Sequence, residues 1–223
     1  MKIAVLFENC QTLDVACLDV LGNCGKEYIS SLASVPAFAA LLPYAVEMEY
    51  IYLSSGSAPS PMTIGLTCVP NTTYAEAPVD VDMVFVGGSL THNEDSLQYM
   101  RAVYADPKPK VIMTVCTGGA WVADSGILDG LNATTNRGLL QSARDSYPSV
   151  HWKDQRWVVD QRGHVEFWTS GGAVADEGMD MVLEYVKRHF HPLIANMSGG
   201  SLDMMARGVE YETQETEQIM CQL

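Results

Sequence analysis

The chain has 223 residues, of which 48% are hydrophobic and 18% are charged, a balance typical of a globular domain that buries its own core. Its formal net charge of −14 argues against a nucleic-acid partner and against an anionic membrane surface, because both require clustered Lys and Arg side chains.

The sequence shows no sign of a membrane span or a secretory leader. No apolar run approaches the roughly 20 residues of a transmembrane helix, and residues 1–8 are too short for the apolar part of a signal peptide. We therefore expect a soluble, cytoplasmic protein. In a reducing compartment cysteines outside CxxC pairs are expected to be free and mostly buried, and this applies to Cys10, Cys17, Cys24, Cys68, Cys116 and Cys221.

In the first half of the chain, apolar strand-like runs alternate with segments of helical spacing. Glycine and proline mark most of the boundaries. The expected elements are a strand at 2–7, a helix at 13–21, a connection at 26–45 with a short helix, a strand at 47–54, a loop or two-stranded excursion at 58–74, a strand at 82–86 and a helix at 93–104.

The second half continues this alternation and ends in an acidic tail. The expected elements are a strand at 111–115, helices at 120–125 and 137–147, a hairpin of 157–159 with 164–169, and a last helix at 176–190. This order predicts a mainly parallel sheet covered on both faces, with its site beyond the carboxyl ends of the strands. We expect one α/β domain over residues 1–191 and a tail over 192–223 that packs on the body or on a partner.

The most informative residue is Cys116, which lies between an apolar β-branched run and a helix-like segment. This layout is typical of a nucleophile elbow, a tight strand-to-helix turn that holds a reactive side chain at the edge of a sheet. A helix beginning at the sulfur favours the thiolate over the thiol. The alternative is a plain core cysteine, but the flanking Thr and Gly residues favour the nucleophile.

Asp14 and the glycine pair Gly87–Gly88 are candidate partners of Cys116. The carboxyl group of Asp14 either starts a helix or leans toward the sulfur, where burial raises its pKa and keeps a proton available. The N–H groups of the glycines can bind developing negative charge, although a tight turn needs glycines as well. Thr117 adds an N–H and a hydroxyl, or simply starts the helix.

His164 and Glu166 are the other candidate pair, since His-x-Glu can complete a Cys-His-Glu triad of the kind found in class I glutamine amidotransferases. His164 directly follows Gly163 in an expected hairpin turn, however, so an exposed surface position is favoured. No metal-ligand spacing and no nucleotide-binding loop is present. We expect neither a metal nor a cofactor.

The ordered motifs resemble the DJ-1/PfpI superfamily and, within it, the isonitrile (isocyanide) hydratase-like branch. The resemblance covers about residues 2–190. It rests on residues 7–14 (FENCQTLD), 85–88 (FVGG), 115–118 (VCTG), 126–130 (GILDG) with 133–135 (ATT), and 169–172 (TSGG) followed by 178–180 (GMD).

This resemblance implies a flavodoxin-like, class I glutamine amidotransferase-like three-layer sandwich with a nucleophile elbow, and a homodimer. It implies a hydro-lyase in which Cys116 attacks an isocyanide, Asp14 moves the proton, Thr117 positions the bound group, and water releases an N-substituted formamide. The motif positions Gly87, Gly88, Gly118 and Met179 are then expected to bind the substrate or its developing charge.

Several positions depart from the hydratase pattern. Asn136–Arg137 stand where relatives frequently carry His-Trp, and Val15 follows Asp14 where a Gly-Pro pair is frequent. Thr117 stands where the protease and glyoxalase branches typically carry His, which argues against both. A lyase or isomerase acting on another reactive metabolite, and a redox sensor oxidised at Cys116, are the alternatives to a hydratase. A helix-turn-helix regulator is disfavoured because only about 30 residues follow the last expected helix, and this segment is too short and too acidic to bind DNA.

Overall fold

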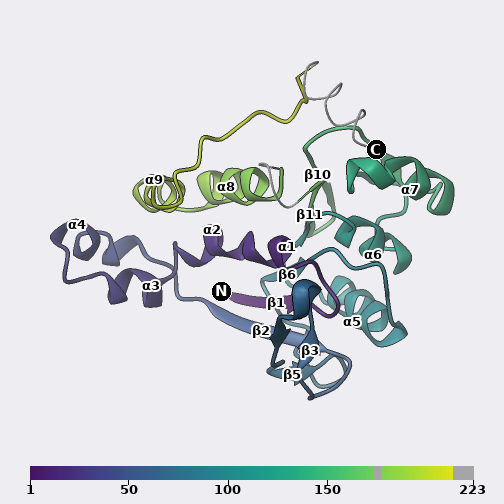
Figure 1. The fold of residues 1–223 in the computed structure, drawn as a ribbon, viewed down its shortest axis with the longest axis horizontal. Helices are drawn as coiled ribbons and strands as arrows, with labels where there is room; N and C mark the ends of the chain where they lie inside the picture. The colour runs from purple at the N-terminus through teal and green to yellow at the C-terminus, as the bar shows by residue number, and fades with distance from the viewer. Residues whose placement is uncertain (173–176, 213–223) are drawn as a thin grey trace.

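A computed structural model describes residues 1–172 and 177–212, and its centre is a seven-stranded sheet (Figure 1). The sheet order is β10-β11-β7-β6-β1-β2-β5, and every neighbouring pair is parallel except β10 and β11. The strands are β1 (Lys2–Leu6), β2 (Glu49–Ser54), β5 (Thr72–Thr73), β6 (Met83–Val86), β7 (Lys110–Thr114), β10 (Trp157–Arg162) and β11 (Val165–Ser170).

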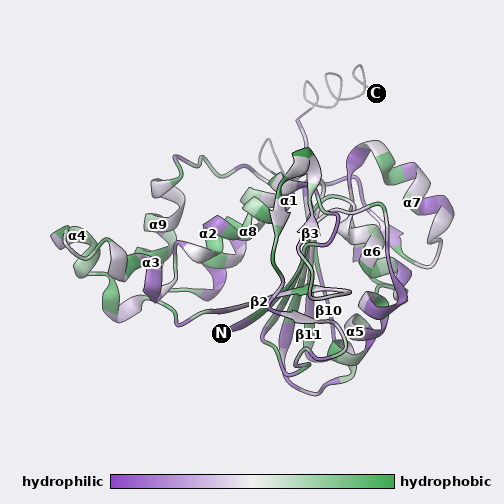
Figure 2. Cartoon of the chain, turned by 60° about the horizontal axis from the view of Figure 1, so that its bottom comes forward, coloured by the Kyte–Doolittle hydropathy of each residue, from purple (hydrophilic) through white to green (hydrophobic). Residues whose placement is uncertain are grey.

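Helices cover both faces of the sheet, as Figure 2 shows. One layer holds α2 (Leu18–Gly22), α8 (Glu177–His189) and α9 (Pro192–Ser201), which pack on one another. The other layer holds α5 (Glu94–Ala105), α6 (Gly118–Asp124) and α7 (Leu140–Ser146). The central strands are buried on both sides, which explains their unbroken apolar sequences. The predicted three-layer α/β sandwich with a mainly parallel sheet is confirmed.

Most predicted elements are present, with some breaks and additions. The helix expected at 13–21 is divided at Cys17 into α1 (Thr12–Ala16) and α2, and the connection at 26–45 contains three short helices, α3 (Lys26–Ser31), α4 (Pro36–Ala39) and η1 (Leu42–Tyr44). The excursion at 58–74 is two-stranded. The smaller elements are β3 (Ser60–Pro61), η2 (Thr63–Gly65), β4 (Thr67–Cys68), β8 (Asn132–Ala133), η3 (Arg137–Leu139) and β9 (His151–Trp152).

Helix α9 was not predicted, because its sequence is rich in glycine and serine, which are weak helix formers. Pro192 occupies its first turn, where the missing N–H costs nothing, and His191 Nδ1 accepts from the N–H of Leu193 at 3.3 Å. Tertiary packing supplies the rest, since Ile194 is fully buried and Ser198 donates to the carbonyl of Val20. Asp176 and the tail beyond residue 212 lie outside the described residues.

No helix within the described part of the chain is both long enough and apolar enough to cross a membrane.

Candidate active site

Gly88 is the point at which the predicted site residues meet. A Cβ atom at this position would lie 2.3 Å from Asp14 Oδ2, 2.9 Å from Thr117 Oγ1 and 3.1 Å from Cys116 Cβ. The loops that follow β1, β6 and β7 therefore converge at the carboxyl edge of the sheet, as parallel topology requires. Only a residue without a side chain allows this approach.

Cys116 occupies a strained turn between β7 and α6. Its φ is +57°, a left-handed conformation that is uncommon for a residue with a side chain. Two contacts hold the turn. Thr135 Oγ1 donates to the Cys116 carbonyl at 2.9 Å, and a Cβ at Gly118 would lie 2.5 Å from the carbonyl oxygen of Val86. The predicted elbow is thus formed, with Gly118 packed beneath it.

The sulfur of Cys116 is nearly enclosed, with 6% of the residue exposed. Burial and the adjacent Asp14 charge raise its pKa to about 11, while the side-chain amide of Asn136, at 3.3 Å, and the Thr117 N–H lower it. The Thr117 N–H at the start of the helix favours the thiolate, as expected, but the net shift of the Cys116 pKa favours the thiol. The reason is that desolvation and a neighbouring carboxylate outweigh the donors around the sulfur.

Asp14 is fully buried beside the sulfur. Burial raises the pKa of its carboxyl group from 3.8 to about 7, and the Gly88 N–H and the Cys116 side chain offset part of that shift. Oδ2 accepts from the Gly88 N–H at 2.9 Å, whereas Oδ1 has no hydrogen-bond partner among the described residues. The carboxyl group therefore retains its proton to far higher pH than an exposed aspartate does.

The glycine pair does not provide free donors for developing charge. The Gly87 N–H donates to the Leu6 carbonyl at 3.2 Å, and the Gly88 N–H donates to Asp14. A Cβ at Gly87 would meet Cys10 Sγ at 3.1 Å, so this residue packs beneath the site. The oxyanion role expected for the pair is corrected accordingly. The hydroxyl of Thr117 donates to the Ser89 carbonyl at 3.0 Å.

A pocket of about 550 Å³ opens above Cys116. None of the described residues that line it is of a charged type. They are Asn9, Gln11, Thr63, Gly88, Ser89, Leu90, Thr91, Cys116, Thr117, Asn136 and Leu139. Met179, expected to bind substrate, lies elsewhere, in a hollow between α8 and residues 202–207. Within residues 1–172 and 177–212, no group of three or more His, Cys, Asp or Glu side chains could hold a metal ion.

Asn136 was noted in the sequence only as a departure from the hydratase pattern, not as a site residue. Its amide nitrogen donates to Cys116 Sγ, and its Oδ1 accepts from the N–H of Gly138 at 3.0 Å, which fixes the orientation of the amide. The available signal was its place directly after the Ala-Thr-Thr motif, since Thr135 already holds the elbow.

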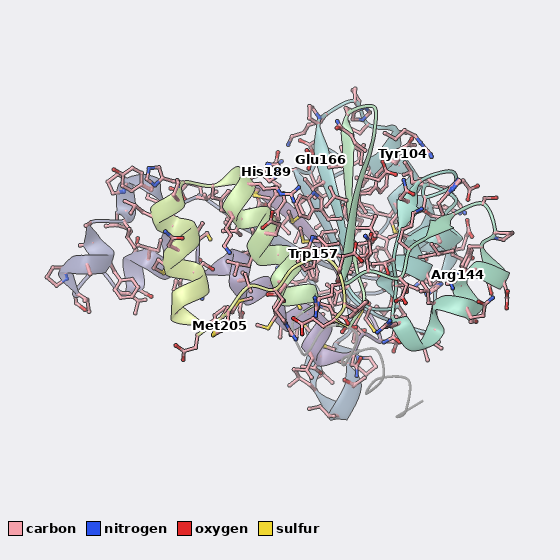
Figure 3. The ribbon with its side chains drawn as sticks, turned by 90° about the horizontal axis from the view of Figure 1, so that it is seen from above. Tyr104, Arg144, Trp157, Glu166, His189 and Met205 are labelled. Carbon is pink, nitrogen blue, oxygen red and sulfur yellow. The ribbon has the colours of Figure 1, made fainter. Side chains whose placement is uncertain are left out.

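His164 and Glu166 lie at the far end of the sheet from Cys116. The His164 carbonyl accepts from Lys110 at the start of β7, whereas Cys116 follows the end of that strand. Glu166 lies 3.7 Å from His189 and is seen beside it in Figure 3. The surface interpretation of this pair is therefore correct.

Glu177 is a second buried carboxylate near the carboxyl edge of the sheet, the edge at which Cys116 lies. It accepts from the hydroxyl of Tyr211 at 2.7 Å and from the N–H of Gly172. Burial raises its pKa, and these donors together with the charges of Arg156 and Arg137 offset part of the shift. The guanidinium of Arg137 lies 4.0 Å from the centre of the Tyr211 ring. Glu177 thus ties the segment that carries Tyr211, within the expected tail, to α8.

Solved structures with this fold include a ThiJ/PfpI family protein from Pseudomonas syringae (TM-score 0.70, 17% identity, 93% of this chain and 76% of that one). An AraC family transcriptional regulator from Pseudomonas putida has a TM-score of 0.69 at 16% identity, covering 90% and 98% of the two chains. DJ-1 from Schizosaccharomyces pombe has 0.64 at 15%, covering 92% and 100%. No family model and no curated protein matches the sequence. The chain has the flavodoxin-like fold of DJ-1/PfpI proteins.

Proposed function

We propose that the chain is a cysteine-dependent enzyme that hydrates an isocyanide to an N-substituted formamide, as its resemblance to hydratases implies. The observation that carries this proposal is the pairing of a buried thiol, Cys116, with the buried carboxyl of Asp14, whose pKa is raised, at the base of an uncharged pocket. Such a pair holds protons ready for transfer instead of a free thiolate. This pair suits a neutral substrate that must gain a proton at carbon.

In the first step, the sulfur of Cys116 adds to the terminal carbon of the isocyanide. The Asp14 carboxylic acid gives its proton to that carbon and takes the thiol proton, so one S–H bond breaks while a C–S and a C–H bond form. The product is a neutral thioimidate. Covalent attachment divides one difficult addition into two easier steps.

In the second step, water adds to the thioimidate carbon. The Asp14 carboxylic acid left by the first step gives its proton to the substrate nitrogen as the C=N bond becomes single, and the resulting carboxylate takes a proton from the water as the C–O bond forms. The carbon-bound hydroxyl then loses its proton while the C–S bond breaks and the Cys116 sulfur gains one, which releases the formamide. Asn136 and the Thr117 N–H face the sulfur and stabilise the charge that returns to it.

Two other functions rest on the same cysteine. A lyase or isomerase acting on another uncharged electrophile would use the same pair of groups. A peroxide sensor is less favoured, because oxidation requires a thiolate and burial raises the Cys116 pKa to about 11.

Intact mass spectrometry with an alkyl isocyanide tests the proposal. We expect a thioimidate adduct on the protein and the N-substituted formamide in solution, with both absent in Cys116→Ala. Stoichiometric oxidation by peroxide without turnover of any isocyanide would support the sensor instead and overturn the hydratase.

We also propose a homodimer. Residues 28–46 contain no charged side chain, and α3, α4 and η1 project from the body there (Figures 1 and 2). In a chain of net charge −14, two copies meet with least repulsion on such a face. Light scattering should give twice the chain mass, and Phe38→Glu should reduce it. A monomer at micromolar concentration would contradict this proposal.

A cytoplasmic location is proposed on the state of the thiols. The five cysteines within the described ranges are free, which suits a reducing compartment. Cell fractionation tests this placement.

A further inference from the structure

A second hollow opens beside the Cys116 pocket, between α6 and α7. Its volume is about 150 Å³. It shares four wall residues with the main pocket, Ser89, Leu90, Thr117 and Leu139. These shared residues make the two hollows direct neighbours, and Cys116 lines only the main one. We call the side hollow the α6–α7 groove.

The wall common to both hollows presents apolar surface to solvent. Leu90 is 81% exposed and Leu139 is 43% exposed, although both line the pocket that contains Cys116. Ala143 adds a buried methyl group deeper in the groove. An exposed apolar surface inside a ligand site is the kind of surface that an apolar substituent covers on binding.

The polar groups of the groove are already engaged or neutral. His92 Nε2 lies 3.2 Å from the Ser89 carbonyl and its Nδ1 lies 3.4 Å from Asp124 Oδ2, while the ring stacks on Trp121. The described residues lining the two hollows include no Lys or Arg. A carboxylate or phosphate on the ligand would therefore meet no counter-ion and would lie near the Asp124 carboxylate.

We propose that the α6–α7 groove is the subsite for the substituent of the substrate, and that it takes an uncharged aryl group. A volume of about 150 Å³ is that of a cavity known to hold one benzene molecule, so the groove has room for one phenyl ring against Leu90, Leu139 and Ala143. The inference rests on the proposed role of Cys116 as the nucleophile. Benzyl-type isocyanides are then better substrates than methyl isocyanide.

The test measures alkylation of Cys116 by N-benzylmaleimide and N-ethylmaleimide, with peptide mapping to assign the adduct. The rate constant for each maleimide with Cys116 is divided by the rate constant of the same maleimide with glutathione. This ratio removes the difference in intrinsic reactivity between the two reagents. We expect Cys116 to prefer the benzyl reagent by about tenfold. In Ser142→Phe, a ring added at an exposed position of the groove should reduce the preference to about one. The control Gln141→Phe, also exposed on α7 but outside the lining, should retain it.

Equal normalised rates in the wild type, or a preference that survives Ser142→Phe, would overturn the subsite. The assay does not depend on isocyanide turnover. If the benzyl preference behaves as expected while no isocyanide is hydrated, the subsite stands and the hydratase fails. If isocyanides are hydrated without any aryl preference, the hydratase stands and the subsite fails.

Discussion

Two buried carboxylates lie at the same edge of the sheet, and their surroundings differ. Asp14 has one oxygen bonded to the Gly88 N–H and one without a partner among the described residues. Both oxygens of Glu177 are bonded, one to Tyr211 and one to Gly172, and two arginine charges stabilise it.

The difference separates a group that can exchange a proton from one that maintains the structure. A buried polar atom without a partner is costly, and such atoms persist where function needs them. Asp14 touches the nucleophile, whereas Glu177 joins α8 to the segment carrying Tyr211. We therefore expect substitutions of the two carboxylates to affect different measurements.

The largest expected effect is on turnover. Asp14→Asn should reduce isocyanide hydration by a factor of about 10² to 10⁴, the usual contribution of a positioned acid or base, because an amide cannot deliver the proton. Glu177→Gln should leave turnover per folded molecule within about threefold of wild type. Comparable losses in both variants, measured as kcat on samples with equal folded fraction, would remove the distinction.

The next largest effect is on stability as a function of pH. The folded-state pKa of Asp14 lies above its value of 3.8 in the unfolded chain, so stability from this group is greatest below pH 4 and is lost as pH rises to about 7. As the pH rises from 4 to 8, the free energy of unfolding of Asp14→Asn should increase relative to that of wild type by up to about 4 kcal/mol. Urea unfolding at both pH values measures this gain, and a constant difference would contradict it.

A third effect concerns the thiol itself. The Asp14 charge is the second cause of the high Cys116 pKa, so Asp14→Asn should lower that pKa and accelerate alkylation by iodoacetamide at pH 8, about tenfold for each unit. The variant would thus be more reactive toward alkylation and yet inactive as an enzyme. Slower alkylation in Asp14→Asn would show that the carboxylate activates the sulfur instead.

The smallest expected effects come from single donors on each side of the comparison. Asn136→Ala removes the amide that faces the sulfur and should slow alkylation by roughly threefold to tenfold, the value of one hydrogen bond.

Tyr211→Phe keeps the ring over Arg137 but loses the bond to Glu177. It should lower the free energy of unfolding by about 1 kcal/mol without changing the alkylation rate.

The sheet and the elbow could be predicted because their signals are local. Continuous apolar runs identified the buried strands, and the residues around Cys116 identified the turn. Parallel topology then brought Asp14, Gly88 and Thr117 to the same edge. Helix α9 could not be predicted from local propensity, since it depends on contacts with α8 and with Val20 that are distant in sequence.

The protonation state of the site could not be predicted for a similar reason. The charge preference of Cys116 depends on how deeply the sulfur is buried and on the proximity of Asp14, and neither is encoded in the elbow motif. The Gly87 and Gly88 N–H groups are occupied by Leu6 and Asp14, which only the three-dimensional pairing reveals. The same holds for Met179 and Asn136. Met179 was expected in the site but lines another hollow, whereas Asn136 was not expected there and donates to the sulfur.

The stacking of Trp121 on His92 gives this molecule an optical reporter. The indole is fully buried, donates to Ser96 Oγ at 2.9 Å, and lies nearly parallel to the imidazole at 5.4 Å between ring centres. The same histidine, His92, lines the α6–α7 groove. A ligand that shifts the histidine will therefore change the tryptophan emission, so that occupancy can be followed in real time without a label.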